Sequence, residues 1–462
     1  MNALNSRHLS ILLVIFCLLS PQAVRGELLA ASGATKVVEL QPLQNSTSAL
    51  SLVWPIGHPT QNRVAAVKAR ISTIVSGGTT SRSSYEIESF LKLKGVEQHV
   101  DFSGQNLILT VSAPNEVFPE TLIHLENLLL EPEYSSEWYA RELETFRLTH
   151  STITRRPSDV LAEIADFLEH ERGDTANGLN DGDIRFGRPT QAIVRSVDQE
   201  VKRRINRLIN KMPTAKTKWK LPLAKWIGAL TDESKEKFTL PKGIVHFADL
   251  DSSEMLILIV SAKEYRDETD QLGANVLVDY IGANQGSEMF RIIRQKMRAA
   301  YDPRSDFIVM GKNKALISIS ATVEALEWPK IYNKINDIYE SVRSGFVEQD
   351  SLEIQLDSLG RVYYYYFFNN PVWAVRQYIH EHPSGANDIV NIPLFGAFGT
   401  VSTEEIVESS RELLPAFEDF LVILIGGGAS PKDSLRSKGY CALPKNTPLR
   451  YCLEVLSNAE NL

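Results

Sequence analysis

The sequence predicts an α+β protein made of two homologous α/β-sandwich domains in one chain, each with an antiparallel-rich sheet and helices packed on it. Three observations predict this fold. The chain has 462 residues, which is enough for more than one domain. Apolar residues alternate at period two in some segments and recur at helical spacing in others. The order of these segments in the first half occurs again in the second, which indicates an internal duplication.

The elements of the first half follow from its apolar pattern. Residues 106–112 place Leu107, Leu109 and Val111 on one face, which predicts a half-buried strand. Ser158 is the expected N-cap of a helix that runs to residue 169. Helical spacing of apolar residues predicts helices at 116–130, 138–149 and 158–169.

The second half repeats this order after a change in composition. Residues 212–242 are rich in Lys, Pro and Thr, which predicts a linker. Strands are expected at 255–260, 315–322 and 420–425, and helices at 267–281, 288–298 and 328–345. The chain is therefore divided into a signal peptide at 1–26, a lead-in at 27–50, a first domain at 51–211, the linker, and a second domain at 243–462.

The N-terminus predicts export. Arg7 and His8 precede an apolar run from Leu9 to Leu19, and Pro21 ends it. This run is shorter than the ~20 residues of a membrane-spanning helix, so a signal peptide cleaved after Gly26 is expected. We expect a periplasmic or secreted protein without a membrane span after cleavage. An uncleaved anchor is the alternative.

Charge and cysteine content restrict the classes of partner and compartment. The formal net charge of −8 argues against nucleic acid as a partner. The basic residues between Lys202 and Lys211 are expected on the solvated face of a helix. Cys441 and Cys452 lie eleven positions apart near the C-terminus. An oxidising compartment favours a disulfide between them, and two free thiols are the alternative.

Motifs of the second half resemble one family of peptidases. The run Gly286–Phe290 (GSEMF) leads to Arg294 and, seven positions later, to Tyr301. This order resembles the second-domain signature of the pitrilysin/insulinase zinc peptidases, although Arg298 stands where that family has Gly. The resemblance implies that Arg294 and Tyr301 bind peptide substrate. A helix-surface ion pair and a core tyrosine are the alternative.

Landmarks of the first half are similar to the same family. Gly78-Thr79 resembles the stretch that follows the family's zinc motif, and Leu128–Pro132 and Arg141-Glu142 resemble the next conserved stretches. Arg185–Pro189 resembles a Gly-Arg-Pro loop. The similarity extends over roughly residues 50–428, so it implies the family's fold for nearly the whole exported chain.

The residues that would hold zinc are missing. The family places His-x-x-Glu-His on a helix, where the two His bind zinc and the Glu activates water, and a later Glu completes the site. Counting back from Gly78, the three motif positions fall on Ala69, Ser72 and Thr73, and the later one on or near Thr149. Alanine cannot bind a metal, and a serine is too weak a base. We therefore expect no catalytic residue, no metal and no cofactor, although the family uses zinc.

Other histidines and aromatics have simpler interpretations. His380-Glu381-His382 is the densest histidine group, but Pro383 follows and no third ligand can be named, so structural or surface residues are expected. His124 and His170 are expected on helix surfaces. The aromatic run Tyr363–Phe368 predicts either a buried helix or an apolar surface for a partner.

The resemblance implies a function without catalysis by this chain alone. The first hypothesis is an exported pitrilysin/insulinase-like subunit that forms a heterodimer with a zinc-bearing relative and helps bind its peptide substrate. The second is a binding or assembly protein on the same fold with no role in proteolysis. The third is an active metalloendopeptidase whose ligands lie elsewhere in the sequence.

Overall fold

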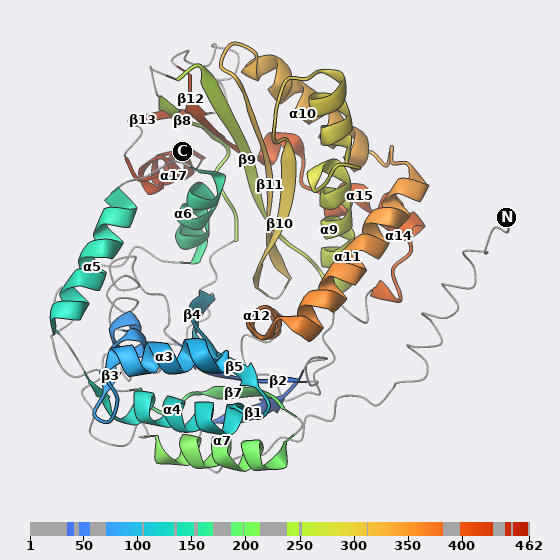
Figure 1. Ribbon diagram of the computed structural model, residues 1–462. Coiled ribbons are helices and arrows are strands. Elements are labelled where there is room, and N and C mark those ends of the chain that lie inside the picture. Colours follow the sequence, from blue (N-terminus) through green and yellow to red (C-terminus); the bar gives the residue numbers. More distant parts are fainter. Residues whose placement is uncertain are drawn as a thin grey trace.

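Two β-sheets organise the chain, as the computed structural model shows (Figure 1). The structure describes residues 35–40, 46–55, 71–103, 106–133, 136–151, 156–169, 186–196, 198–212, 238–248, 252–311, 313–381, 398–427, 439–444 and 447–460. The expected signal peptide and residues 213–237 of the expected linker lie outside these ranges.

The first half carries a five-stranded sheet, with the strand order β1-β7-β2-β5-β4. Its elements are β1 (Lys36–Glu39), β2 (Thr47–Pro55), β3 (Gly78–Thr79), α3 (Ser84–Lys94), β4 (Glu97–Ser103), β5 (Asn106–Pro114), α4 (Phe118–Leu130), β6 (Pro132–Glu133), α5 (Ser136–Ser151), α6 (Pro157–Glu169), β7 (Gln191–Arg195) and α7 (Gln199–Lys211).

The second half carries a six-stranded sheet, with the strand order β10-β11-β9-β12-β8-β13. Its elements are β8 (Gly243–Ala248), β9 (Glu254–Glu264), α9 (Glu268–Gly282), the π-helix η2 (Phe290–Lys296), β10 (Arg304–Gly311), β11 (Lys314–Glu324), α10 (Trp328–Arg343), α11 (Gln349–Asn369), α12 (Pro371–Glu381), α14 (Thr403–Glu408), α15 (Ser410–Leu413), the 3-10 helix η3 (Phe417–Asp419), β12 (Leu421–Gly426), β13 (Tyr440–Pro444) and α17 (Arg450–Glu460).

The two sheets share one topology. The orders β4-β5-β2-β7-β1 and β10-β11-β9-β12-β8 correspond strand by strand. In both sheets the pair at the end of this order is parallel, and the other neighbours are antiparallel. Strand β13 is an addition to the second sheet and pairs parallel with β8. The predicted α+β class is confirmed, and the repeated strand order agrees with the duplication that the sequence indicated.

Three expectations about local structure need correction. The expected lead-in contains strand β1 and the start of β2, and β1 was missed because four residues are too few to show a period. Ser158 is not an N-cap, because helix α6 begins one residue earlier at Pro157, an imino acid that suits a first helical position. The helix expected at 288–298 is mainly the π-helix η2.

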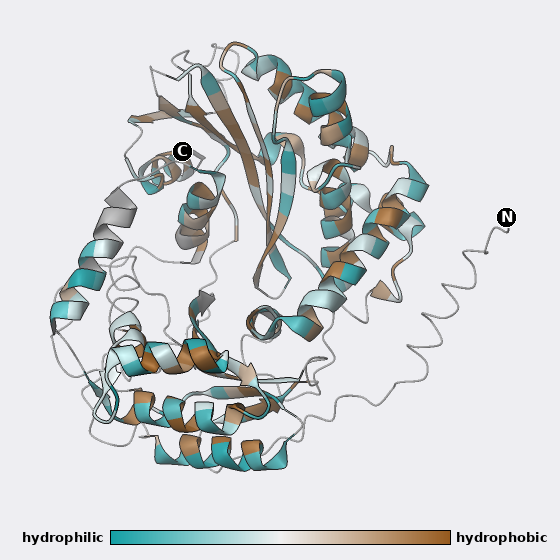
Figure 2. Ribbon diagram, viewed as in Figure 1, coloured by the Kyte–Doolittle hydropathy of each residue, from teal (hydrophilic) through white to brown (hydrophobic). Residues whose placement is uncertain are grey.

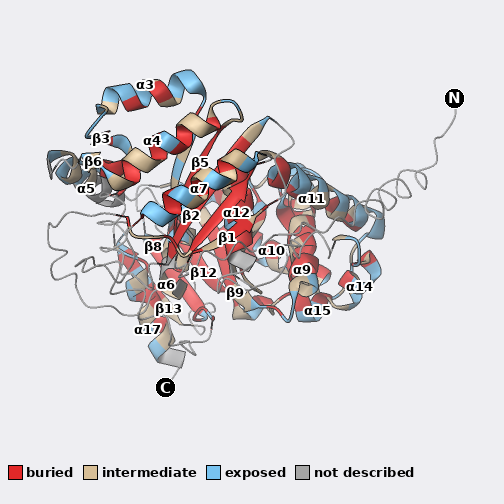
Figure 3. Cartoon of the chain, turned by 90° about the horizontal axis from the view of Figure 1, so that it is seen from below, coloured by how far each residue is buried: buried red, intermediate tan, exposed pale blue. Residues whose placement is uncertain are grey.

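Each sheet is covered on one face by helices of its own half. Helices α4 and α7 pack on the first sheet, and α9 and α10 pack on the second. Alternate residues of β9 separate accordingly, because Ile257 and Ile259 face α9 and α10 while Leu258 and Val260 face the opposite side. The strands of the second sheet are correspondingly apolar along their length, and buried residues follow the strands of the sheets (Figures 2 and 3).

The other face of each sheet is covered by a helix from the opposite half. Helix α12 contacts β2, β4 and β5 of the first sheet, and α6 belongs to the apolar cluster beneath the second sheet. The backbone N–H of Leu449 donates to Glu163 of α6 at 2.7 Å, and Arg376 of α12 pairs with Asp101 of β4. Each half therefore completes the core of the other (Figure 1).

Arg195 is the largest fully buried side chain and joins the two halves. It ends strand β7, and its Nη1 donates to the carbonyl oxygen of Phe367 in α11 at 2.6 Å. The guanidinium carbon also lies 4.6 Å from the centroid of the Phe367 ring, in a cation–π contact. Burial lowers the pKa of Arg195 to about 9, so the group is still a cation at neutral pH.

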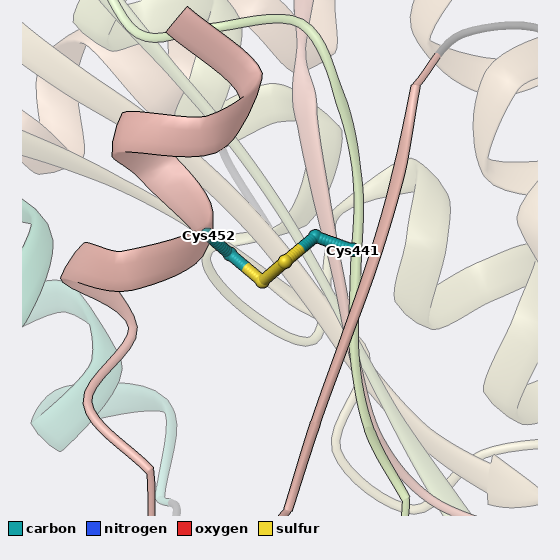
Figure 4. Close-up of a disulfide and its surroundings, with 2 residues drawn as sticks. All are labelled: Cys441 and Cys452. Atoms are coloured by element: carbon teal, nitrogen blue, oxygen red, sulfur yellow. A yellow bond between two sulfur atoms is a disulfide. The ribbon is translucent and has the colours of Figure 1, made fainter. Parts of the chain in front are cut away.

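A disulfide between Cys441 and Cys452 fixes the added strand. It joins β13 to helix α17, with the two Cα atoms 5.7 Å apart (Figure 4). Both residues belong to the same apolar cluster as Val160 and Ile164 of α6. The bond therefore stabilises the part of the second half on which helix α6 packs.

None of the helices in the described ranges has the length and apolar character needed to cross a membrane.

We predict that Arg195→Ala lowers the free energy of unfolding by about 2–3 kcal/mol, because it leaves a cavity and the Phe367 carbonyl without its donor. Arg195→Met keeps part of the packing and should cost less. Chemical denaturation followed by circular dichroism measures both values. Arg207→Ala, at an exposed position of α7, is the matched control. A change for Arg195→Ala no larger than that of the control would contradict the role of Arg195.

We also predict that the double change of Cys441 and Cys452 to Ala lowers the free energy of unfolding by about 3 kcal/mol. The closed loop spans eleven positions, and its closure restricts the unfolded chain. Reductant should reproduce the loss in the unchanged protein and should have no effect on the double variant. A reductant-sensitive double variant would show that the loss has another cause.

Candidate functional site

The segment in which the zinc-motif positions are expected is partly described. Residues 71–76 are helical, and the Ser72 Oγ donates to Glu142 Oε2 of α5 at 3.0 Å. Thr73 is fully buried. Strand β3, which follows this helix, pairs with β6, so two landmarks of the sequence are neighbours in space. The helix at 71–76 and α5 are therefore in contact.

Glycine at this position has a steric reason. A Cβ atom on Gly78 would lie 2.8 Å from Glu133 Oε2 and 3.1 Å from the carbonyl oxygen of Arg82. The Glu133 carboxylate is the far end of a flexible side chain and can move, so the steric limit at Gly78 is mild. At Gly77 a Cβ atom would lie 2.3 Å from the backbone carbonyl oxygen of Thr73, which is the stricter contact. The turn after this helix therefore favours glycine at Gly77, independent of any metal.

The residues present do not fit zinc. Ser72 and Thr73 offer neutral hydroxyls, and the Glu142 carboxylate already accepts from Ser72. The backbone of Thr149 lies about two helical turns after Glu142 on α5, which places both on one face. Its side chain and the whole of Ala69 lie outside the described residues. Among the residues that the structure does describe, no group of three or more His, Cys, Asp or Glu could hold a metal ion.

The described histidines have structural surroundings. His246 lies between Tyr440 Oη, 3.1 Å from Nδ1, and the carbonyl oxygen of Gly426, 3.2 Å from Nε2. His124 was expected on a helix surface, but it is 3% exposed and packs 5.4 Å from the Phe90 ring. Helix α4 is covered by α3 as well as by the sheet, and this second covering layer could not be read from a helical period. The side chains of the His380–His382 group lie outside the described residues.

The second-half motif is held by a network of short hydrogen bonds. Asn284 Nδ2 donates to Gln355 Oε1 of α11 at 2.7 Å, and the buried Ser287 Oγ donates to the carbonyl oxygen of Asn284 at 2.6 Å. The backbone N–H of Gly286 donates to Asn284 Oδ1 at 2.8 Å. This turn therefore fixes the start of η2 against the neighbouring helix.

The end of η2 has an unusual geometry. The N–H of Met297 donates to Ile292 at 3.0 Å, and the N–H of Ala299 donates to Ile293 at 3.1 Å. Arg298 lies between them with φ 55°, in the left-handed region. This is the position after a helix end where Gly is favoured, because a Cβ is unfavourable there. The geometry explains the Gly of the family and shows that Arg298 occupies its place under strain.

Arg294 and Tyr301 are brought together by this helix end. Arg294 donates from Nη1 to the carbonyl oxygen of Tyr301. Its guanidinium carbon lies 5.1 Å from the Phe290 ring centroid. The Tyr301 side chain is 82% exposed, so it is not the core tyrosine of the alternative interpretation. The Arg294 guanidinium, which is held by the Tyr301 main chain, and the exposed Tyr301 phenol thus lie on one short segment. Both groups can donate hydrogen bonds to a ligand.

A shallow depression adjoins the same helix. Its lining residues include Glu288 and Ile292 on the side of η2, and Lys334 of α10 with the exposed Phe346 opposite. Both apolar and charged residues line the depression, and neither Arg294 nor Tyr301 is among them.

The aromatic run of α11 is divided between core and surface. Tyr363, Phe367 and Phe368 are buried, whereas Tyr364, Tyr365 and Tyr366 are 43–61% exposed. Helical spacing separates the two groups. Both interpretations of the run are therefore partly correct, since the same helix supplies core residues and an exposed aromatic surface.

The sequence indicated some of these features and missed others. It marked Arg294, Tyr301 and the zinc positions, because these follow from motif spacing. It did not indicate the Ser72–Glu142 contact, which joins segments 70 positions apart. The substitution of Gly by Arg298 was the available signal for the left-handed backbone.

The geometry defines a class: a duplicated α+β protein in which Ser72 and Thr73, the described residues at the expected zinc-motif positions, offer only hydroxyl groups. Comparison with known proteins agrees. Residues 197–359 match the family model described as the peptidase M16 inactive domain. No curated protein sequence is significantly similar to the chain.

Solved structures with the same fold include proteins of equal and of double length. A peptidase M16 inactive domain from Pseudomonas fluorescens is 12% identical, with a TM-score of 0.65 over 86% of this chain and 97% of that one. A protease from Helicobacter pylori is 11% identical, with a TM-score of 0.64, at 85% and 97%. The periplasmic protease PqqL from Escherichia coli is 13% identical, with a TM-score of 0.62, at 86% and 45%. At these identities the likeness shows the fold.

The predicted resemblance is confirmed at this level: residues 197–359 match the model of the peptidase M16 inactive domain. The chain also shares its fold with the solved M16 inactive domain over 86% of its length. Together with the hydroxyls at the zinc-motif positions, this supports a non-catalytic member of the family.

We predict that the buried His124 makes folding sensitive to acid. Burial, and then the charge of Arg82, lower the pKa of folded His124 to about 4, below the value of about 6.5 in an unfolded chain. Between these values the unfolded state binds the additional proton. The free energy of unfolding should therefore fall by up to about 3 kcal/mol as the pH decreases from 6.5 to 4.

Urea denaturation across this pH range measures the effect. His124→Phe should flatten the acid limb, because no proton is taken up at that position. His99→Gln, at a half-exposed histidine of β4, should leave the limb unchanged. Equal pH profiles for the unchanged protein and His124→Phe would show that other groups govern acid unfolding.

Proposed function

We propose that the chain is an exported, non-catalytic M16 subunit that pairs with a zinc-bearing relative and helps to bind its peptide substrate. The observation that carries the proposal is the joint presentation of Arg294 and Tyr301. Arg294 is fixed on the Tyr301 main chain, and the Tyr301 ring is exposed.

The chemistry of these two groups suits a peptide. A guanidinium and a phenol hydroxyl donate hydrogen bonds to carbonyl oxygens, and they stabilise charge that develops on a carbonyl during hydrolysis. Neither group activates water without a metal or a base nearby. In this proposal the segment supplies binding, and another chain supplies the catalytic metal.

The lengths of related proteins support the pairing. This chain matches 45% of PqqL, so that periplasmic protease contains a further part of comparable size. Two half-length chains, one with the zinc ligands and one without, would supply the same amount of structure. The periplasmic location of PqqL and the apolar run at Leu9–Leu19 support export.

We predict that Arg294→Ala combined with Tyr301→Phe lowers kcat/KM of the pair about tenfold or more, because two donors to the bound peptide are lost. The chain is co-expressed with a zinc-bearing M16 relative from the same source, and cleavage of a quenched fluorescent peptide is measured. Arg291→Ala, which removes a cation of the same helix that is already paired with Glu288, is the control.

The outcomes separate the alternatives. An unchanged rate for the double variant within a stable pair would contradict substrate binding. Absence of any complex with a zinc-bearing relative would favour a binding or assembly protein. Stoichiometric zinc in the purified chain, with cleavage that a chelator abolishes, would establish an active peptidase with other ligands.

A further inference from the structure

The end of helix η2 carries an excess of positive charge. Arg294, Lys296 and Arg298, together with Tyr301, form what we call the cationic turn, and all four side chains are exposed. Arg291 is excluded because Glu288 holds it in an ion pair. The whole protein has a net charge of −8, so this segment is a local exception.

The charges of the cationic turn are not neutralised within the described part of the protein. The side chains of Lys296 and Arg298 have no ion pair or hydrogen bond among the described residues. Arg294 donates to a neutral carbonyl oxygen. The next acidic residue in the chain, Asp302, accepts hydrogen bonds from the N–H and hydroxyl of Thr322. Three cations therefore face solvent within five positions.

Arg298 adds an energetic argument. Its left-handed backbone, φ 55°, favours Gly, and the hydrogen bond from the Ala299 N–H to Ile293 fixes that conformation. A long cationic side chain at a position of this kind is unfavourable for folding. Backbone strain of this type is concentrated where a side chain has a binding role.

We propose that the cationic turn selects peptides with acidic residues, and that Arg298 is a specificity-determining residue that binds a carboxylate of the peptide. This inference rests on the proposed function, because Arg294 and Tyr301 hold the peptide main chain. A guanidinium binds a carboxylate in two parallel hydrogen bonds, which Lys296 cannot reproduce. A nucleic acid is disfavoured by the net charge and by the small number of cations.

The experiment uses two fluorescent peptides that differ only in charge, with Asp and Glu in one replaced by Asn and Gln in the other. Binding to the full chain, alone and in the pair with a zinc-bearing relative, is followed by anisotropy. The acidic peptide should bind about three- to fivefold more tightly at low salt, as expected for an exposed ion pair. The preference should decrease as salt is added.

Variants at one position separate charge from backbone effects. Arg298→Gly and Arg298→Ala should both abolish the preference and leave binding of the neutral peptide unchanged. Arg298→Gly should also raise the Tm, because it removes the strain, so a folding defect cannot explain its result. Arg298→Lys should restore part of the preference, and Arg207→Ala on helix α7 should change nothing.

The results that overturn the proposal are distinct from those that overturn the proposed function. Equal affinity for the two peptides at low salt would contradict acidic selectivity while leaving peptide binding intact. A preference that survives undiminished in Arg298→Gly and Arg298→Ala would contradict the assignment of Arg298 as the specificity-determining residue. Arg298-dependent binding of an oligonucleotide in preference to the acidic peptide would also overturn it. Binding of neither peptide, by the chain or by the pair, would contradict both.

Discussion

The fold depends on covering both faces of two sheets in one chain. Strands such as β9 are apolar on both sides, so an uncovered face would expose a large apolar area to water. Each half supplies helices for one face of its own sheet and one helix for the other half, α6 or α12. The buried Arg195 joins strand β7 of the first half to helix α11 of the second, and the apolar cluster around the Cys441–Cys452 bond includes α6. The two halves therefore stabilise each other through shared buried contacts.

The structure around the expected zinc-motif positions does not depend on a metal. The helix at 71–76, the β3–β6 pair and α5 are held by packing and by the steric requirement at Gly77, none of which involves a metal. The Ser72 hydroxyl donates a hydrogen bond to Glu142, and the Thr73 side chain is buried. The fold therefore persists at a site where zinc hydrolysis cannot be supported by the described residues.

The second half presents the opposite situation. There the backbone conformation favours Gly, but the sequence has Arg298. This conformation is unfavourable for the free energy of folding, and the surrounding structure holds it in place. The Asn284–Gln355 hydrogen bond and the buried Ser287 fix the start of the same helix. A rigid segment that ends in exposed cations and an exposed Tyr301 is suited to binding. The difference between the halves indicates where this chain can still recognise a ligand.

The sequence by itself determined the α+β class and the repeated order of elements, because periodicity is a local property. Motif spacing also predicted the positions of the missing zinc residues and marked Arg294 and Tyr301, and these remain predictions. The short strand β1, the burial of His124, the exchange of α6 and α12, and the Ser72–Glu142 contact were decided by tertiary structure. Each of these depends on which segments meet across long stretches of chain, and a local pattern contains no information about a distant partner. The backbone of Arg298 is a local feature, for which the family's Gly was a signal, and the hydrogen bonds at the end of η2 accompany its positive φ.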